Sequence, residues 1–176
     1  MPVIVVGGNG RGVGKTALVC ELIAAFPTSR WTAVKITSHR HGNTGPVWEE
    51  HEPGQETDTA RYLAAGAQNS FLVTAIAEEI PLGAMADAFG GGSNLIFESN
   101  RILGRWKVDL CLGVLGGSTP EFKPSFLPFL HDADAFVLPP EMHRDDLPRL
   151  QPIFRWSDRT RVCPEMIEWL RQRLRT

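Results

Sequence analysis

The chain has 176 residues, a length that suits one domain better than two, so we expect a single domain spanning residues 1–176. With 43% hydrophobic and 22% charged residues, the composition is that of an ordinary globular protein, which excludes a disordered chain, a collagen and a coiled coil. The formal net charge of −2 gives no indication that a nucleic acid or an anionic membrane is a partner.

The sequence also lacks the features of a membrane or secreted protein. No apolar run approaches the ~20 residues of a membrane-spanning helix, and Met1-Pro2-Val3 carries no basic segment of a signal peptide. The three cysteines, Cys20, Cys111 and Cys163, are isolated and flanked by apolar residues, which predicts reduced thiols and no disulfide framework or zinc site. We therefore expect a cytoplasmic protein.

Short apolar runs alternate with segments of helical periodicity along the whole chain. In chain order, the pattern predicts a strand at 3–6, a helix at 18–26, a strand at 32–37, a helix at 56–67, a strand at 70–74, a helix at 81–89, strands at 95–98, 108–115 and 135–138, and a last helix that begins at Pro164. This alternation predicts an α/β protein with three layers, a mostly parallel sheet and helices on both of its faces.

Two stretches lack a clear periodic pattern. Residues 39–55 form a segment too long for an ordinary connection, which predicts a lid or a binding loop that is mobile without a ligand. Residues 116–123 follow the end of a predicted strand, where open α/β sheets bind their ligands.

A glycine-rich segment from Gly7 to Thr16 follows the first strand and precedes the first helix, as a phosphate-binding loop requires. Phosphate oxygens need several converging backbone N–H groups, which side chains would obstruct. Lys15 would reach the β- and γ-phosphates of a nucleoside triphosphate, and the Thr16 hydroxyl would bind Mg²⁺. The predicted nucleotide-binding residues are Asn9, Gly10, Arg11, Gly12, Val13, Gly14, Lys15, Thr16 and Ala17.

One position departs from the full phosphate-loop pattern, because Asn9 stands where the pattern has glycine. Asn is the non-glycine residue that best tolerates a left-handed backbone, so we expect the turn to survive. The alternative is a glycine-rich turn that binds nothing.

Two carboxylates are candidates for the metal shell beside Thr16. Glu98 ends an apolar strand, the arrangement that places an acid beside Mg²⁺, and we assign it with Lys15 to the catalytic centre. Asp58 is the second candidate ligand, although an acid in the first turn of a helix also stabilises the helix dipole. The alternative for Glu98 is a solvated residue at a strand end.

Four segments in order resemble the molybdopterin-guanine dinucleotide biosynthesis protein B (MobB) family. They cover roughly the first two-thirds of the chain: the loop that ends in Gly14-Lys15-Thr16; Ala33-Val34-Lys35-Ile36 with the following His39-Arg40-His41-Gly42; Pro53-Gly54-Gln55-Glu56-Thr57-Asp58-Thr59 with Ala64-Ala65-Gly66-Ala67; and Ile96-Phe97-Glu98. The chain differs from the family pattern at Ser99-Asn100 and at Trp48-Glu49-Glu50.

The resemblance implies a small GTP-binding protein of the phosphate-loop class, typically a homodimer, that assists the attachment of GMP to molybdopterin and hydrolyses its nucleotide slowly. It also implies molybdopterin and a nucleotidyltransferase protein as partners. Base choice rests on the resemblance alone, because the guanine-reading Asn-Lys-x-Asp motif does not follow the strand at 135–138, where Pro139-Pro140-Glu141 stand instead. The nucleotide is therefore expected to be GTP, with ATP as the alternative.

Lys35, His39 and His41 are the candidate substrate or lid residues. Lys35 ends a buried strand, which points its ammonium to the rim of the site, for contact with phosphate or substrate or for a structural ion pair. The two histidines, with His51 and neighbouring glutamates, form either a lid that touches a phosphate or pterin, a solvated loop, or a metal site.

The C-terminal third is rich in arginine with interspersed acids, which indicates a mixed solvated surface more than an anion-binding patch. Trp156 and Trp169 are interpreted as core or interface residues.

Three functions remain open from the sequence. The first is a GTP-binding accessory protein of molybdenum-cofactor biosynthesis, the second an ATP-dependent small-molecule kinase or related phosphoryl transferase, and the third a nucleotide-gated module that binds a partner with negligible catalysis.

Overall fold

The computed structural model describes residues 1–38, 45–76, 79–90, 92–116, 122–142, 151–158 and 160–174. Within these ranges the strands are β1 (Val3–Gly8), β2 (Trp31–Thr37), β3 (Val47–Glu50), β4 (Asn69–Thr74), β5 (Asn94–Glu98), β6 (Leu110–Val114), β7 (Ala135–Leu138) and β8 (Ile153–Arg155). The α-helices are α1 (Lys15–Ala25), α2 (Asp58–Ala64), α3 (Leu82–Phe89), α4 (Leu127–Asp132) and α5 (Pro164–Arg173), and short 3₁₀ turns span Pro27–Ser29 and Pro124–Phe126.

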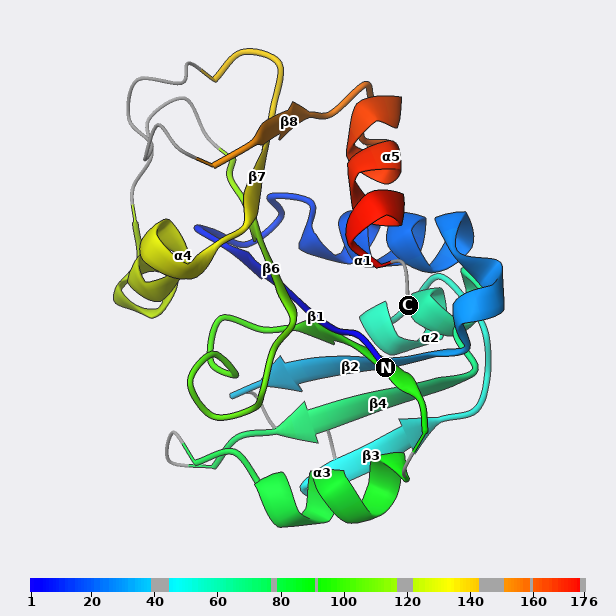
Figure 1. Ribbon diagram of the computed structural model, residues 1–176. Coiled ribbons are helices and arrows are strands. Elements are labelled where there is room, and N and C mark those ends of the chain that lie inside the picture. The colour runs from blue at the N-terminus through cyan, green and yellow to red at the C-terminus, as the bar shows by residue number, and fades with distance from the viewer. Residues whose placement is uncertain are drawn as a thin grey trace.

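The described strands form one sheet in the order β3-β4-β2-β5-β1-β6-β7-β8 (Figure 1). Every neighbouring pair is parallel except β3 with β4, which is antiparallel at one edge of the sheet. In the sheet, β1 lies between β5 and β6, and the chain leaves the carboxyl end of β1 to enter α1. The carboxyl end of β1 is therefore a point where neighbouring connections diverge, the usual ligand-binding edge of an open parallel sheet.

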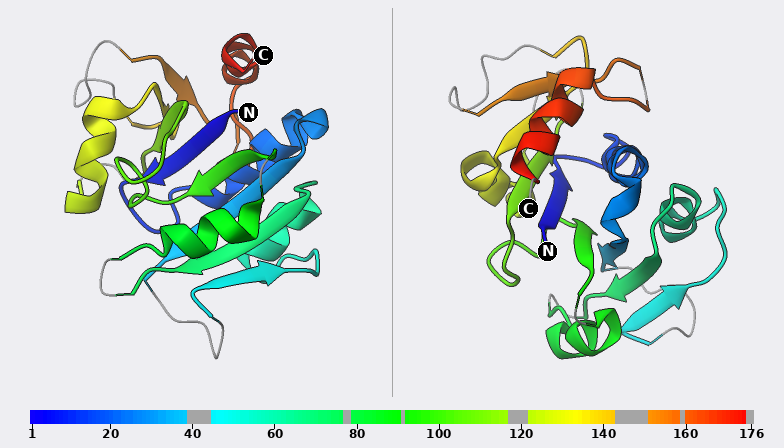
Figure 2. Two further views of the ribbon diagram at one scale, coloured as in Figure 1. Left: turned by 60° about the horizontal axis from the view of Figure 1, so that its bottom comes forward. Right: turned by 45° about the vertical axis from the view of Figure 1, so that its right-hand side comes forward.

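Apolar side chains fill both faces of the sheet, because parallel strands covered by helices on both sides are buried twice. Along β1, Ile4 and Val6 point into a core shared with α1, α2 and α5, whereas Val5 points into a core shared with α3 and α4. Figure 2 shows α1 and α2 on one side of the sheet and α3 on the other. The predicted three-layer α/β fold is confirmed.

The structure differs from the sequence prediction at the edges of the sheet. Residues 39–55 are not one long irregular loop, because Val47–Glu50 form the edge strand β3. Edge strands often carry charged residues that prevent further pairing. Because Glu49 and Glu50 are charged, β3 lacks the apolar run from which the other strands were predicted. The strand β8 and the short helix α4 were also missed. The helix α2 begins at Asp58 because the Thr57 hydroxyl caps it, accepting from the Ala60 N–H at 3.1 Å.

The cysteines and the membrane prediction are consistent with the structure as far as it describes them. Cys20, Cys111 and Cys163 are all free thiols, and burial raises the pKa of Cys20 to about 11. Of the helices in the described ranges, none is long and apolar enough to span a membrane.

Gly7 permits a close contact between the central strand and α4. A Cβ atom at this position would lie 2.2 to 2.6 Å from three ring atoms of Phe129, which is fully buried. The ring therefore packs directly on the backbone of β1, just before the phosphate loop.

We predict that Gly7→Ala lowers the free energy of unfolding by about 1 to 3 kcal/mol, because the added methyl group overpacks a rigid part of the core. Urea unfolding measures this change. Gly83→Ala is the matched control: it lies in α3 with nothing within 4 Å of the added Cβ, so we expect it to raise the stability by about 0.5 to 1 kcal/mol. Unchanged stability of Gly7→Ala would contradict this packing.

Candidate functional site

The loop between β1 and α1 has the backbone of a phosphate-binding loop. Gly12 and Gly14 adopt positive φ angles of 69° and 105°, a conformation that side chains disfavour. Gly14 is the N-cap of α1, so the N-terminal N–H groups of that helix face the loop. The Lys15 ammonium donates to the Gly10 carbonyl at 2.6 Å, and burial lowers the pKa of Lys15.

Asn9 does not have the left-handed backbone that the sequence analysis expected. Among the described non-glycine residues only Arg30 has a positive φ. Instead, Asn9 is buried and its side chain bonds the backbone of Gly116 twice: Nδ2 donates to the Gly116 carbonyl at 3.0 Å, and Oδ1 accepts from the Gly116 N–H at 3.0 Å. The asparagine therefore connects the phosphate loop to the segment after β6. The expectation that Asn9 replaces glycine by adopting a left-handed backbone is wrong.

A buried carboxylate lies at the centre of the site. Glu98, at the end of β5, is 2% exposed and accepts hydrogen bonds from Thr16 at 2.7 Å, from the Lys35 ammonium and from the Tyr62 hydroxyl. Lys35 also pairs with Asp58 at 2.9 Å. Four elements, α1, β2, α2 and β5, thus bring their side chains to one point at the carboxyl edge of the sheet.

The charges of Lys35 and Asp58 favour each other's ionised form. Burial opposes the charge of Lys35, but the Glu98 and Asp58 carboxylates hold the pKa of Lys35 above its usual value. Burial also opposes the charge of Asp58, yet the neighbouring Lys35 ammonium holds its pKa below the usual range. Burial and the Glu98 charge raise the pKa of Tyr62 well above its usual value, so its hydroxyl remains a hydrogen-bond donor.

The oxygen atoms of Thr16, Asp58 and Glu98 suit a magnesium ion. Carboxylate and hydroxyl oxygens are hard ligands, which Mg²⁺ prefers, and it binds through one or two carboxylates together with substrate phosphates. The Lys35 ammonium lies between the two carboxylates, so a metal ion bound by both of them would take the place of the ammonium. The three residues predicted from the sequence as metal ligands are therefore brought together, and they fit the ion.

The cavity over the phosphate loop, of about 630 Å³, is strongly cationic. Its lining contains two carboxylates, Asp58 and Glu98, against six cationic side chains: Arg11, Lys15, Lys35, Arg61, Arg101 and Lys123. This excess of positive charge matches a polyphosphate.

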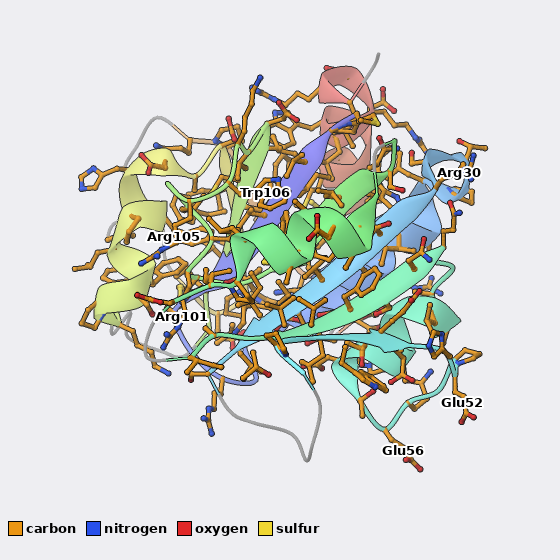
Figure 3. The ribbon with its side chains drawn as sticks, turned by 90° about the horizontal axis from the view of Figure 1, so that it is seen from below. Arg30, Glu52, Glu56, Arg101, Arg105 and Trp106 are labelled. Carbon is orange, nitrogen blue, oxygen red and sulfur yellow. The ribbon has the colours of Figure 1, made fainter. Side chains whose placement is uncertain are left out.

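Several residues of this cavity were not found from the sequence. Arg101 follows β5 (labelled in Figure 3), and Lys123 precedes a 3₁₀ turn; both line the phosphate cavity. Asn100 bonds the Gly8 N–H and the Gly8 carbonyl, each at 2.8 Å, and so holds the start of the loop. Two features of the sequence could have indicated site residues. Asn100 lies where the chain differs from the family pattern, and Tyr62, which donates to Glu98, lies four residues after Asp58 on the same face of α2.

A second cavity, of about 680 Å³, shares Gly12 and Gly14 with the phosphate cavity and extends to the segments after β7 and β8. Its other lining residues include Pro139, Pro140, Glu141, Trp156 and Asp158. Trp156 is a core residue, as predicted, and its indole lies so close to Gly14 that a Cβ there would be 2.7 Å from the ring. The same tryptophan also lines this cavity.

The candidate lid histidines, His39 and His41, lie outside the described residues. His51, the third histidine of the possible metal site, is exposed after β3. In the part of the chain that the structure describes, no group of three or more His, Cys, Asp or Glu residues is arranged to hold a metal ion.

Together, the mostly parallel sheet, the helices on both faces and the glycine loop between β1 and α1 define a three-layer P-loop NTPase fold. No family model and no curated protein sequence matches the chain. Among solved structures, it is similar to LpxK from Aquifex aeolicus in complex with ATP, with a TM-score of 0.57 and 19% identity over 88% of this chain. The chain spans about half of that protein, 53% of its length, and the likeness is one of fold.

We predict that Asn9→Gly destabilises the protein by about 1 to 3 kcal/mol, although it restores the glycine of the phosphate-loop pattern, because the Gly116 N–H and carbonyl then lose their partners. Asn9→Asp keeps the acceptor and loses the donor, so its loss should be intermediate. Denaturant unfolding of the three proteins measures the order, and a glycine variant as stable as the parent would contradict the role assigned to Asn9.

We also predict that Lys35→Met lowers the free energy of unfolding at neutral pH by about 3 kcal/mol, because Glu98 would remain buried without its cation. The double variant Lys35→Met/Glu98→Gln should recover at least half of that loss, since the amide removes the buried charge and still accepts from Thr16. Urea unfolding of the parent and both variants tests the pair. A double variant no more stable than Lys35→Met would show that charge is not the cause.

Proposed function

We propose that this protein binds a nucleoside triphosphate with Mg²⁺ over the phosphate loop, and that it is a GTP-binding accessory protein of molybdenum-cofactor biosynthesis with slow hydrolysis. The proposal combines the geometry of the site with the resemblance of four sequence segments to the MobB family.

One observation carries the proposal. The four segments that carry the resemblance are scattered over the first 98 residues, yet each contributes a side chain to the same hydrogen-bonded cluster: Thr16, Lys35, Asp58 and Glu98. A chance resemblance in sequence has no reason to converge on one point in space. This convergence supports a common task for the four segments.

Each residue of the site has a role in this proposal. The backbone N–H groups of the loop surround the β-phosphate, and the Lys15 ammonium leaves the Gly10 carbonyl to contact the β- and γ-phosphates. Thr16, Asp58 and Glu98 are the residues that would hold Mg²⁺, which would supply positive charge against the phosphate oxygens. Arg101 and Lys123 add positive charge on the same cavity.

The base would lie in the cavity formed by Pro139, Pro140, Glu141, Trp156 and Asp158, because this cavity adjoins the loop at Gly12 and Gly14. GTP is proposed from the family resemblance. Molybdopterin, a nucleotidyltransferase partner and a homodimeric assembly belong to the same proposal.

A second candidate function is an ATP-dependent phosphoryl transferase that acts on a small molecule. A specific observation favours it: a further cavity, of about 410 Å³, adjoins the phosphate cavity and shares Lys35, Thr37 and Asp58 with it. The structurally similar LpxK was solved with ATP. In such a reaction an acceptor hydroxyl oxygen forms a bond to the γ-phosphorus, the bond from that phosphorus to the β–γ bridging oxygen breaks, and the nucleoside diphosphate leaves while the hydroxyl proton passes to solvent.

We predict that Lys15→Ala weakens triphosphate binding at least about a hundredfold while the protein stays folded, because the ammonium serves ligand phosphates and not the core. Calorimetry with GTP and with ATP, each with Mg²⁺, measures the loss. Arg171→Ala, an exposed cation on α5 that is 56% accessible, is the control and should leave both affinities unchanged. Equal affinity of a folded Lys15→Ala protein would refute the phosphate site.

Thermal shift with GTP, ATP and molybdopterin separates the candidate functions, because a ligand that binds only the folded state stabilises it more, at equal concentration, the more tightly it binds. Stabilisation by GTP over ATP, with little phosphate release, supports the accessory protein. Preference for ATP, with nucleoside diphosphate formed faster when an acceptor is added, supports the transferase.

A further inference from the structure

The cavity of about 410 Å³ beside the phosphate site is built by one face of the sheet and the start of α2. Its lining residues are Lys35, Thr37, Trp48, Glu50, Glu56, Thr57, Asp58, Thr59 and Leu72. The strand β3, which the sequence analysis took for loop, supplies two of these residues. The proposed GTP-binding accessory function does not use this cavity, whereas the phosphoryl-transferase alternative would place its acceptor there.

Three of the lining side chains form a row across adjacent strands. Lys35 of β2 is in register with Leu72 of β4, and Leu72 is in register with Trp48 of β3. Residues paired in this way point to the same face of a sheet, and adjacent strands lie about 4.8 Å apart. The row therefore runs about 10 Å, from an ammonium beside the phosphate site, over an aliphatic side chain, to an indole at the edge.

The wall above this row is acidic. The Glu50 carboxylate accepts four hydrogen bonds, from the N–H groups of His51 and Glu52 and from the hydroxyls of Thr57 and Thr59, at 3.1 to 3.3 Å. All four donors are neutral groups, and among the described residues Glu50 has no ion pair. Glu56 adds a second charge at the exposed rim (Figure 3).

The two adjoining cavities thus differ in sign. Among the residues that the structure describes, the phosphate cavity is lined by six cationic groups and two carboxylates, whereas this cavity is lined by one cation, Lys35, and three carboxylates, of which Asp58 is paired with it. A phosphate ester or carboxylate would be repelled by this cavity and attracted to the neighbouring phosphate cavity. A flat ring, by contrast, gains from contact with the Trp48 indole and the Leu72 side chain.

We propose that this cavity is the site of a second ligand: a neutral or cationic small molecule with a planar ring and hydroxyl or amine groups, its ring against Trp48 and its polar end toward Lys35 and Asp58. The proposal rests on the proposed function, which places the triphosphate in the neighbouring cavity. It also implies that the phosphate group of a phosphorylated pterin would not lie in this cavity.

The test uses the full chain labelled with ¹⁵N-tryptophan, and the signal is the Trp48 indole resonance, assigned by its loss in Trp48→Leu. The probes are pyridoxine, pyridoxamine and pyridoxine 5′-phosphate, which share one hydroxylated ring and differ in charge. Titrations are done with and without a non-hydrolysable ATP or GTP analogue and Mg²⁺. We expect the two phosphate-free probes to shift the Trp48 resonance and to bind at least threefold more tightly than the phosphate ester.

Two exposed glutamates provide a matched pair of variants. Glu56 lines the cavity and Glu52 does not, although both point outward at the same corner of the molecule (Figure 3). Glu56→Lys should weaken pyridoxamine at least twofold and strengthen the phosphate ester, whereas Glu52→Lys should change neither affinity by that much. Trp48→Leu should weaken the ring probes at least fivefold, measured by ligand-observed saturation transfer, with Trp169→Leu as its control.

The inference is overturned if no probe at millimolar concentration shifts the Trp48 resonance, or if the phosphate ester binds as well as pyridoxine. These outcomes are distinct from failure of the proposed function. If the triphosphates bind and no probe reaches Trp48, the inference alone is wrong; if the probes reach Trp48 and no triphosphate binds, the proposed function alone is wrong.

Discussion

The arrangement of the candidate site depends on one buried carboxylate. Glu98 is almost fully removed from water, and an ionised carboxylate in such a position is costly unless donors surround it. Its donors, Thr16, Lys35 and Tyr62, come from α1, β2 and α2. Satisfying this charge therefore fixes the positions of two helices relative to the sheet, and with α1 the position of the phosphate loop.

The same carboxylate also organises the acidic part of the site. Because the Lys35 ammonium already lies between Glu98 and Asp58, the oxygens that suit Mg²⁺ are held together by a cation that belongs to the chain. A divalent ion held here would take the place of this single positive charge. The charge pattern around the loop therefore does not have to be assembled at the moment of binding, which lowers the cost of organising the site.

The sequence predicted those parts of the molecule whose structure depends on residues close together in the chain. Buried strands are continuous apolar runs, and the glycine loop is a local motif, so the fold class and the positions of Lys15, Thr16 and Glu98 followed from spacing. The edge strand β3 was missed because Trp48-Glu49-Glu50 carries charges, and the role of Asn9 was missed because its partner, Gly116, is 107 residues away. Tyr62 was missed because a single tyrosine in a helix has the pattern of a core residue.

Lys35 belongs to both ligand cavities, and this shared position gives the two cavities a physical connection. Its ammonium is bound to Glu98 on the phosphate side and to Asp58 where the cavities meet. A metal ion held by both carboxylates, as proposed above, would take the place of the ammonium, and Lys35 is also one end of the row that it forms with Leu72 and Trp48. If both proposed ligands bind, the Lys35 side chain would couple them, while hydrogen bonds of Glu98, Asn9 and Asn100 hold the strands and the phosphate loop in place.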